Sequence, residues 1–409
     1  MKKQVLYAIA NYEEIVQDHG YFVDKTPYIE KLETVKNPVF LRPRRFGKSL
    51  LCSMLRCYYD LNYQSHFAKL FGHTWIGQHP TGKQNQFIIL SLDFSSLEIG
   101  SSITEIEHSF RRYCNGILAF LQHEYADVFS NDLPKIILDD AVSSNLANLL
   151  HYLRAYHLPP MYVIIDEYDN FANQLVTAHQ DHVYCELTAD NSFLKTFFKT
   201  LKEGRKTGAI ADIFVTGVLP ITIDDLASGY NIANFITLRP KFESMLGFTQ
   251  AEVDKLLDEI YHDYEIDSGT RREVEAVIKN HYDGYHFVTV DGDPLYNSTL
   301  LMYFLHRFID EQTIPKQLID LNLKTDISMV KRLIASNPEH TKDFVEQLAL
   351  HHKIGYDDTL LESFNQFQLF KKGSFPVLLF YLGMLTRQDD FYFKLPNLNM
   401  QQIFVEYFN

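Results

Sequence analysis

One short segment constrains the fold of this chain more than any other. It is Val39–Ser49, VFLRPRRFGKS, in which an apolar run leads into a tight basic loop. After Lys48, apolar residues recur at the i, i+3, i+4 and i+7 spacing of one helix face. A strand, a loop ending in Gly-Lys-Ser and a helix are the context that a phosphate-binding loop requires. The segment therefore predicts an α/β fold with a nucleoside-triphosphate site.

The loop residues fit that chemistry individually. Gly47 lets the backbone approach the phosphates, and backbone N–H groups with the helix N-terminus hold the anion. Lys48 reaches the β- and γ-phosphates and assists catalysis there, while Ser49 ligates Mg²⁺. We expect the nucleotide to be bound by a continuous set of residues: Arg44, Arg45, Phe46, Gly47, Lys48, Ser49 and Leu50.

The loop departs from the usual pattern at its first position, where Arg42 replaces a glycine. That position lies at the strand end, where a side chain can point away from the nucleotide. We therefore expect the loop to bind phosphate despite the missing glycine. The motif alone leaves open a chance Gly-Lys-Ser in a basic turn. The basic residues of the loop either neutralise a triphosphate or reach nucleic-acid phosphate: Arg42, Arg44, Arg45 and Lys48.

A second acidic element follows later in the chain. The apolar strand candidate Tyr162–Asp166 ends in an aspartate, and Glu167 comes next. Asp166 would hold Mg²⁺, usually through water, and Glu167 would orient and polarise the attacking water as a general base. The alternative is a buried strand that ends in a solvated acidic turn. The order of the two motifs, with the strand candidate Phe87–Asp93 between them, favours the Walker B strand of a P-loop ATPase.

The rest of the first half alternates short apolar segments with amphipathic ones, the α/β pattern. Apolar runs without alternation favour strands that are covered on both faces, and hence a mostly parallel five-stranded sheet. The strand candidates are Pro38–Leu41, Phe87–Asp93, Tyr162–Asp166, Asp212–Thr216 and Phe235–Leu238. Helices are expected after Lys48 and over Thr104–Phe129, Asn148–Tyr156 and Ser192–Gly204.

The strand that ends at Thr216 should lie between the strands that carry the two motifs. Thr216 would then sit near the γ-phosphate as a catalytic sensor, and an ordinary strand end is the alternative. The pattern changes near residue 240, where strand candidates become rare and two capping boxes, Thr249–Glu252 and Thr270–Glu273, open helices. We therefore expect an N-terminal lead-in plus P-loop ATPase domain over residues 1–241, and a helical lid plus C-terminal helical domain over residues 242–409.

Composition excludes several classes of protein. The 409 residues are 46% hydrophobic and 22% charged, which excludes a disordered chain. The formal net charge of −14 argues against coating nucleic acid by bulk charge, so phosphate binding needs a local basic patch. The longest apolar run, Phe375–Thr386, is too short to cross a bilayer and is interpreted as buried core.

The ends and the cysteines favour a cytoplasmic protein. The apolar stretch Val5–Ala10 is too short for a signal peptide and is followed at once by polar residues. No two cysteines form a C-x-x-C pair, which argues against a disulfide framework and fits a reducing compartment. The cysteines are Cys52, Cys57, Cys114 and Cys185.

Three weaker patterns have structural alternatives. One helix face carries a lysine stripe that would contact phosphates or lie in solvent: Lys195, Lys199, Lys202 and Lys206. Arg205 beside it is a candidate arginine finger in trans, and Arg44 or Arg45 is the alternative in cis. His179-x-x-His182-x-x-Cys185 has metal-like spacing without a convincing fourth ligand. Asp24 and Lys25 either bracket a nucleotide base or brace the sheet.

Several segments together resemble a known family. They are Tyr21–Thr26, Arg42–Ser49, Asp166–Asp169, Thr216–Val218, Ser228–Ile232 and Tyr282–Tyr285. They are similar to the "VDKT", "RPRRFGKS", "DEYD" and later motifs of the AAA-ATPase-like family of bacterial proteins, often joined to a PD-(D/E)xK-type nuclease domain. The resemblance implies an ATP-binding core, and ATP rather than GTP. No Asp followed by Glu-x-Lys on a strand pattern is found after residue 340, so a nuclease would be truncated away or lie on another chain.

These observations lead to three hypotheses. The first is an ATP hydrolase that uses Mg²⁺-ATP to drive conformational change or assembly. The second is a nucleotide-gated binding or regulatory module with little hydrolysis. The third is a DNA-acting component of a mobile-element or defence system that works with a nuclease. A homo-oligomer, a nuclease partner and a DNA partner are left open, and no membrane partner is expected.

Overall fold

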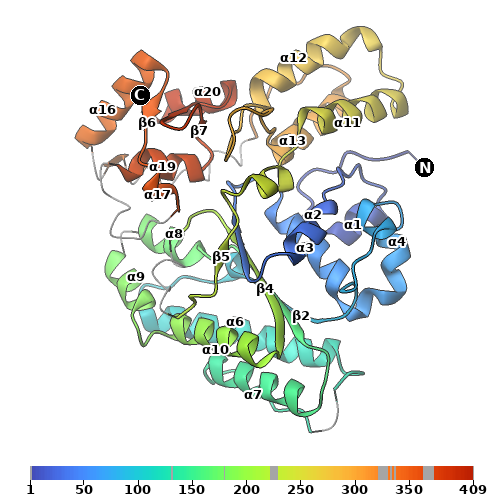
Figure 1. The fold of residues 1–409 in the computed structure, drawn as a ribbon. Coiled ribbons are helices and arrows are strands. Elements are labelled where there is room, and N and C mark those ends of the chain that lie inside the picture. Colours follow the sequence, from blue (N-terminus) through green and yellow to red (C-terminus); the bar gives the residue numbers. More distant parts are fainter. Residues whose placement is uncertain are drawn as a thin grey trace. The chain divides into compact units, whose positions relative to one another are not determined.

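The computed structural model describes residues 2–129, 132–178, 180–221, 229–320, 330–331, 334–335, 338–362 and 373–408. The chain forms two compact units, each assembled from separate segments (Figure 1). The sheet unit comprises Ile29–Phe40 and Met54–Ile236. The loop unit comprises Met1–Tyr28, Leu41–Ser53 and Thr237–Asn409, so the segment with the Gly-Lys-Ser loop clusters with the C-terminal part of the chain. Whether residues 1–241 and 242–409 fold as separate domains stays a prediction.

The sheet unit is built on five parallel strands in the order β2-β3-β4-β1-β5, which confirms the predicted α/β class. β1 and β3 are buried at every position, which explains their unbroken apolar sequences. β4 lies between β3 and β1, as predicted from the motif order. The strands are β1 (Pro38–Leu41), β2 (Ile88–Asp93), β3 (Met161–Asp166), β4 (Ile210–Gly217) and β5 (Asn234–Phe235).

The strand register fixes which residues meet at the carboxyl edge of this sheet. β2 and β3 pair without a shift at that edge, where Asp93 lies opposite Asp166. β3 pairs with β4 so that Ile165 lies opposite Val215, which puts Thr216 at the same level as Asp166. Because parallel strands point the same way, the ends of all these strands share one edge.

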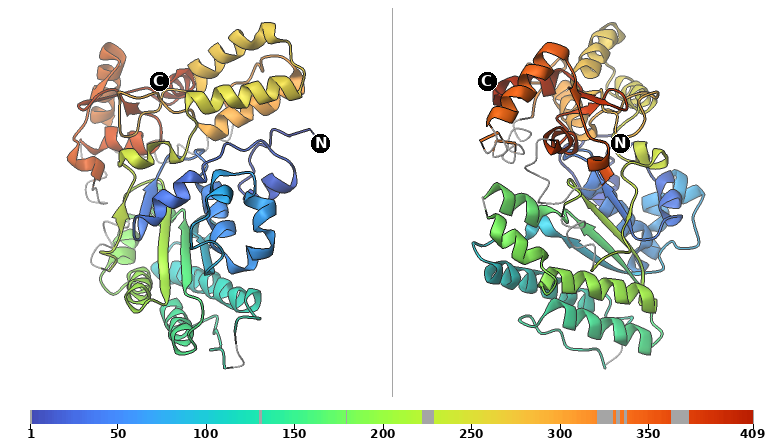
Figure 2. Two further views of the ribbon diagram at one scale, coloured as in Figure 1. Left: turned by 45° about the vertical axis from the view of Figure 1, so that its right-hand side comes forward. Right: turned by 60° about the vertical axis from the view of Figure 1, so that its left-hand side comes forward.

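Three helices of the sheet unit lie together on one side of the sheet (Figures 1 and 2). They are α6 (Ile103–Glu124), α7 (Val142–Ala155) and α10 (Phe193–Thr207). All three were expected, although α6 ends five residues early and α7 begins at Val142. The unit also contains α4 (Phe67–Phe71), α5 (Trp75–Gln78), α8 (Asn170–Thr177) and α9 (Asp181–Thr188).

Two helices are divided between the two units. α3 (Lys48–Tyr59) begins in the loop unit and continues in the sheet unit, and α2 (Pro27–Glu33) does the same. The short helix α1 (Tyr12–Gln17) precedes them and is capped by Asn11, whose side chain accepts a hydrogen bond from the Glu13 N–H.

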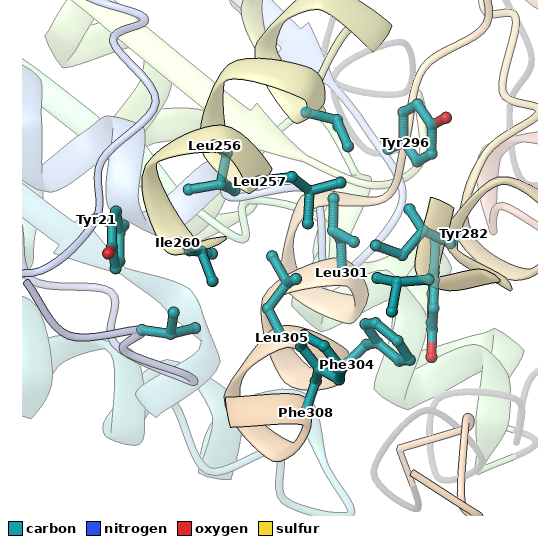
Figure 3. Close-up of a cluster of buried hydrophobic side chains, with 14 of the residues drawn as sticks. Tyr21, Leu256, Leu257, Ile260, Tyr282, Tyr296, Leu301, Phe304, Leu305 and Phe308 are labelled. Atoms are coloured by element: carbon teal, nitrogen blue, oxygen red, sulfur yellow. The ribbon is translucent and has the colours of Figure 1, made fainter. Parts of the chain in front are cut away.

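The loop unit contains a hydrophobic core formed by three helices (Figure 3). They are α11 (Gln250–Asp263), α12 (Arg271–Tyr282) and α13 (Ser298–Glu311). Leu257, Leu301 and Phe304 are fully buried in this core, and Tyr21 from the N-terminal segment packs against the same cluster. Apolar residues at helical spacing on all three helices therefore meet in one cluster, as amphipathic helices require.

The two predicted capping boxes have different outcomes. The Thr249–Glu252 box is present, because the Thr249 hydroxyl accepts from the Glu252 N–H and the Glu252 carboxylate accepts from the Thr249 N–H. The Thr270–Glu273 box is wrong. A short 3₁₀ turn precedes α12 and is capped by Asp267, while the Thr270 hydroxyl donates to the Asp267 carbonyl. The chain is already helical at Thr270, so that residue cannot act as the cap.

The remaining part of the loop unit combines helices with a small antiparallel sheet in the order β6-β8-β7. These strands are too short to leave a periodic signal in the sequence. The run Phe375–Thr386 is largely buried, as predicted for a core segment. The elements are α16 (Pro338–His351), β6 (Ile354–Gly355), α17 (Thr359–Glu362), α19 (Ser374–Tyr381), β7 (Thr386–Arg387), β8 (Tyr392–Lys394) and α20 (Leu398–Phe408).

The core of α11, α12 and α13 predicts the cost of truncating Leu257. Leu257→Ala should lower the free energy of unfolding by roughly 3 kcal/mol, because it removes buried methyl groups and leaves a cavity. Leu350→Ala is the matched control, since Leu350 is 74% exposed on α16 and should cost less than about 0.5 kcal/mol. Urea unfolding measures both, and equal losses would contradict the assigned core.

Candidate functional site

The basic loop follows β1 directly and ends where α3 begins at Lys48. Arg45 and Gly47 both adopt left-handed backbone, with φ of 69° and 93°. Glycine tolerates this conformation, whereas in Arg45 it costs roughly 1–2 kcal/mol. The Arg45 carbonyl accepts a hydrogen bond of 3.1 Å from the Thr299 N–H at the start of α13, which helps to hold the turn. No acidic residue lies in the first turn of α3, so the helix dipole there favours an anion.

Arg42, the residue that replaces the first glycine of the pattern, is 1% exposed. Its guanidinium donates to the carbonyls of Leu41, Thr237 and Glu243 at 3.0–3.1 Å. It also lies 4.3 Å from the ring centre of Phe287. Burial lowers the pKa of Arg42 to about 9, and the Glu243 carboxylate opposes that shift. The group therefore stays charged at neutral pH and ties the loop to residues 237–243.

The remaining loop residues differ in their burial and contacts. Phe46 is buried and packs edge-on against Tyr285 and Phe287, with ring centres 5.1 and 5.3 Å away. Only its backbone can meet a ligand. The buried Lys48 ammonium donates to the carbonyls of Arg42 and Pro43 at 3.1 and 3.2 Å. Ser49 is exposed, while the other predicted binding residues are partly exposed: Arg44, Arg45, Gly47 and Leu50.

The acidic turn follows β3. Asp166 is buried, and its Oδ1 accepts a hydrogen bond of 2.9 Å from the Glu167 N–H. Glu167 is partly exposed and has a positive φ of 50°, an unfavourable backbone conformation for glutamate. Asp93, which the sequence reasoning did not single out, lies opposite Asp166 and is exposed. Asp93 directly follows an apolar run at the end of β2, and this pattern could have marked it in the sequence as a candidate residue beside Asp166.

Asp169, in the same turn, is completely buried. Its carboxylate accepts from the Val218 and Leu219 N–H groups at 3.1 and 2.8 Å, and from the Asn173 side chain at 2.9 Å. Burial, and then the nearby Glu167 carboxylate, raise the pKa of Asp169, while the two backbone N–H groups act in the opposite sense. The turn after β3 is thereby fastened to the segment after β4.

Thr216, the predicted sensor, is 1% exposed at the end of β4. Its hydroxyl donates to the Phe40 carbonyl of β1 at 2.7 Å. In this position the side chain cross-links two neighbouring strands at their carboxyl ends. Its contribution to catalysis stays a prediction.

The lysine of the "VDKT" segment binds within the loop unit. Lys25 contacts both carboxylate oxygens of Glu252 at 2.7 and 2.8 Å and donates to the Ser244 carbonyl at 2.9 Å. The Asp24 carboxylate accepts from the Thr26 N–H and hydroxyl. Since Arg42 binds the neighbouring Glu243 carbonyl, Lys25 and Arg42 hold the same short helical turn, Pro240–Met245.

Two basic residues of the weaker patterns make structural contacts. Lys195 is buried and pairs with Asp190, so the lysine stripe is not a uniform solvent face. Arg205 is bound by the Asn37 side chain and by the carbonyls of Ile210 and Ala211, which fits a brace within the sheet unit better than a residue offered to a neighbouring subunit. His179 lies outside the described residues. The described residues contain no cluster of three or more His, Cys, Asp or Glu side chains suited to a metal ion.

Comparison with known proteins supports a nucleotide-binding fold. The family model described as "Predicted AAA-ATPase" matches residues 6–227, more than half of the chain. Among solved structures, the Walker-type ATPase PABY2304 of Pyrococcus abyssi is similar, with a TM-score of 0.52, 12% identity and coverage of 98% of each chain. At that identity the likeness shows the fold alone. No curated protein matches the sequence significantly. Within the described ranges, no helix has both the length and the apolar character to cross a membrane.

The contacts of Arg42 predict that restoring the glycine of the usual pattern destabilises the protein. Arg42→Gly leaves three carbonyls without their donor and should lower the free energy of unfolding by about 3 kcal/mol or more. Arg44→Gly, in the same loop but partly exposed, should cost about 1 kcal/mol or less. Equal denaturation midpoints for the two variants would show that Arg42 is not a structural tether.

Proposed function

The chain belongs to the predicted AAA-ATPase family, and we propose that it binds Mg²⁺-ATP at the basic loop and hydrolyses it. In this proposal Lys48 and Ser49 act on the phosphates and their metal ion, and Asp166 and Glu167 supply the acidic groups. The products would be ADP and phosphate, with the bond to the γ-phosphate broken by water. The energy would drive conformational change or assembly.

One observation carries the proposal, namely the strand order β3-β4-β1 in a parallel sheet. The Gly-Lys-Ser loop follows β1, and the Asp-Glu pair follows β3. Parallel strands with one intervening strand put both strand ends at the same edge, where open α/β sheets bind their ligands. The strand ends that precede the two motifs therefore share one edge, which supports the proposal.

The residues of the loop suit a polyphosphate. The left-handed turn at Arg45 and Gly47 leads straight into the N-terminus of α3, whose first turn contains Lys48 and Ser49 and no carboxylate. Such a turn offers backbone N–H groups, a positive helix end and an ammonium group to an anion. Arg42 is committed to the carbonyls that it binds, so the charge that meets the phosphates would come from Lys48, Arg44 and Arg45.

The acidic groups suit Mg²⁺ that is bound through few protein ligands. Mg²⁺ usually keeps several waters and takes one or two side chains together with phosphate oxygens. The exposed Ser49 hydroxyl and the Asp166 carboxylate are ligands of that kind, and a dense cluster is not needed. When bound, the ion would neutralise charge on the phosphate oxygens. Glu167 would accept a proton from the attacking water and hold it in line.

Nucleotide binding should depend on Lys48. Lys48→Ala should weaken ATP binding by roughly 10- to 100-fold, because it removes a charge-assisted contact with the phosphates. Isothermal titration calorimetry with a non-hydrolysable ATP analogue measures the change. Lys69→Ala, at an exposed lysine on α4, is the control and should bind like wild type. Unchanged affinity of Lys48→Ala would refute the loop as the nucleotide site.

Hydrolysis should depend on Glu167 more than binding does. Glu167→Gln should reduce phosphate release roughly 100-fold or more while ATP binding is kept, because glutamine cannot accept the proton. Glu203→Gln on an exposed face of α10 is the matched control. Equal turnover of Glu167→Gln and wild type would make the general-base assignment wrong. Tight ATP binding by a wild type that turns over only with an added partner would favour the nucleotide-gated module instead.

A further inference from the structure

The turn after β3 is cross-linked to the backbone that follows β4. The Asp169 carboxylate binds the Val218 and Leu219 N–H groups that directly follow β4. Gly217 is required for this approach, because a Cβ there would lie 2.3 Å from Asp169 Oδ1 and 2.7 Å from a ring carbon of Tyr168. The side chain and the glycine thus fit each other closely.

Two neighbours of Asp169 fasten the same turn to other strand ends. The Tyr168 N–H donates to the Thr216 carbonyl at 3.2 Å, and its hydroxyl donates to the carbonyls of Leu219 and Ile221. The buried Asn170 side chain donates to the Phe94 carbonyl, just past β2, at 2.8 Å. The ends of β2, β3 and β4 are therefore joined by three consecutive side chains.

Glu167 lies inside this cross-linked turn. Its N–H is bound by the Asp166 carboxylate, and its carbonyl accepts from the Asn170 N–H at 3.0 Å. Its left-handed backbone is a conformation that persists only where the surroundings impose it. Because the Glu167 backbone is hydrogen-bonded on both sides, the position of its Cα and the direction of its Cα–Cβ bond are fixed.

We propose that Asp169 is a positioning residue for catalysis, which holds Glu167 in its left-handed turn by clamping the backbone after β4. This inference rests on the proposed ATPase function. Asp169 is fully buried and would act only through Glu167. It also couples Glu167 to the segment after β4, so a displacement of Val218 and Leu219 would alter the direction of the base.

The test is a double-mutant cycle between Asp169 and Glu167. Asp169→Asn turns one acceptor into an N–H group that faces backbone donors, and should lower kcat about 10- to 100-fold while the Kd for ATP changes less than about threefold. In the Glu167→Gln background, the same substitution should change kcat less than about twofold, since there is no base left to position. A loss of the same factor in both backgrounds, or wild-type kcat for Asp169→Asn, would overturn the proposal.

The matched control is Asp60→Asn. Asp60 is as deeply buried in the sheet unit, but it lies beside Phe87 at the start of β2, away from the carboxyl edge. It should lose stability and keep kcat. If Asp169→Asn does not fold, Tyr168→Phe replaces it. A kcat that falls at least about threefold, and only when Glu167 is present, supports the proposal, and an unchanged kcat overturns it.

Measuring the wild type and Lys48→Ala in the same phosphate-release assay distinguishes failure of the ATPase proposal from failure of the positioning role of Asp169. Equal rates for these two proteins overturn the ATPase proposal and the positioning role with it. A wild type that clearly outpaces Lys48→Ala, with Asp169→Asn as fast as wild type, overturns the positioning role alone.

Discussion

Buried backbone groups at the ends of parallel strands need hydrogen-bond partners, and in this protein polar side chains of the sequence motifs supply them. Past the last pair of a ladder, an N–H or carbonyl that stays buried costs about 1–3 kcal/mol if it is unpaired. Asp169 satisfies two such N–H groups after β4, Thr216 satisfies a carbonyl of β1, and Arg42 satisfies the last carbonyl of β1. Polar residues of the sequence motifs therefore also keep the strand ends in order.

In the usual phosphate-loop pattern, the position of Arg42 is a glycine beside the ligand. In this protein Arg42 has a structural role instead. A glycine there would leave the carbonyls of Thr237 and Glu243 without the donors that Arg42 supplies. The buried cation is retained because three carbonyls and the face of Phe287 replace the water that it lost. The basic character of the loop in a chain of net charge −14 thus includes one buried structural cation, Arg42, beside the partly exposed Arg44 and Arg45.

Much of the fold could be predicted from the sequence because the decisive signals are local. The strand–loop–helix of the basic loop, the apolar run before Asp166 and the Thr249 capping box each depend on residues within a few positions of one another. The failed box at Thr270 shows the limit, since Asp267 starts the helical turn earlier and the sequence pattern does not reveal which cap wins. The short strands β6 to β8 escaped prediction because two or three residues have no period.

The sequence by itself determined the class of fold and the place of β4 between β3 and β1, because the order and spacing of the motifs along the chain encode both. It also predicts which residues would meet the phosphates. Only the tertiary structure decided which polar residues are engaged in structural contacts within their own unit. Arg205 and Lys195 were indistinguishable in sequence from exposed basic residues, and both are engaged within the sheet unit. Asp93 and Asp169 gained their places from strand register and from contacts across more than 45 positions of sequence. Such pairings depend on how strands align in space, which no local pattern records.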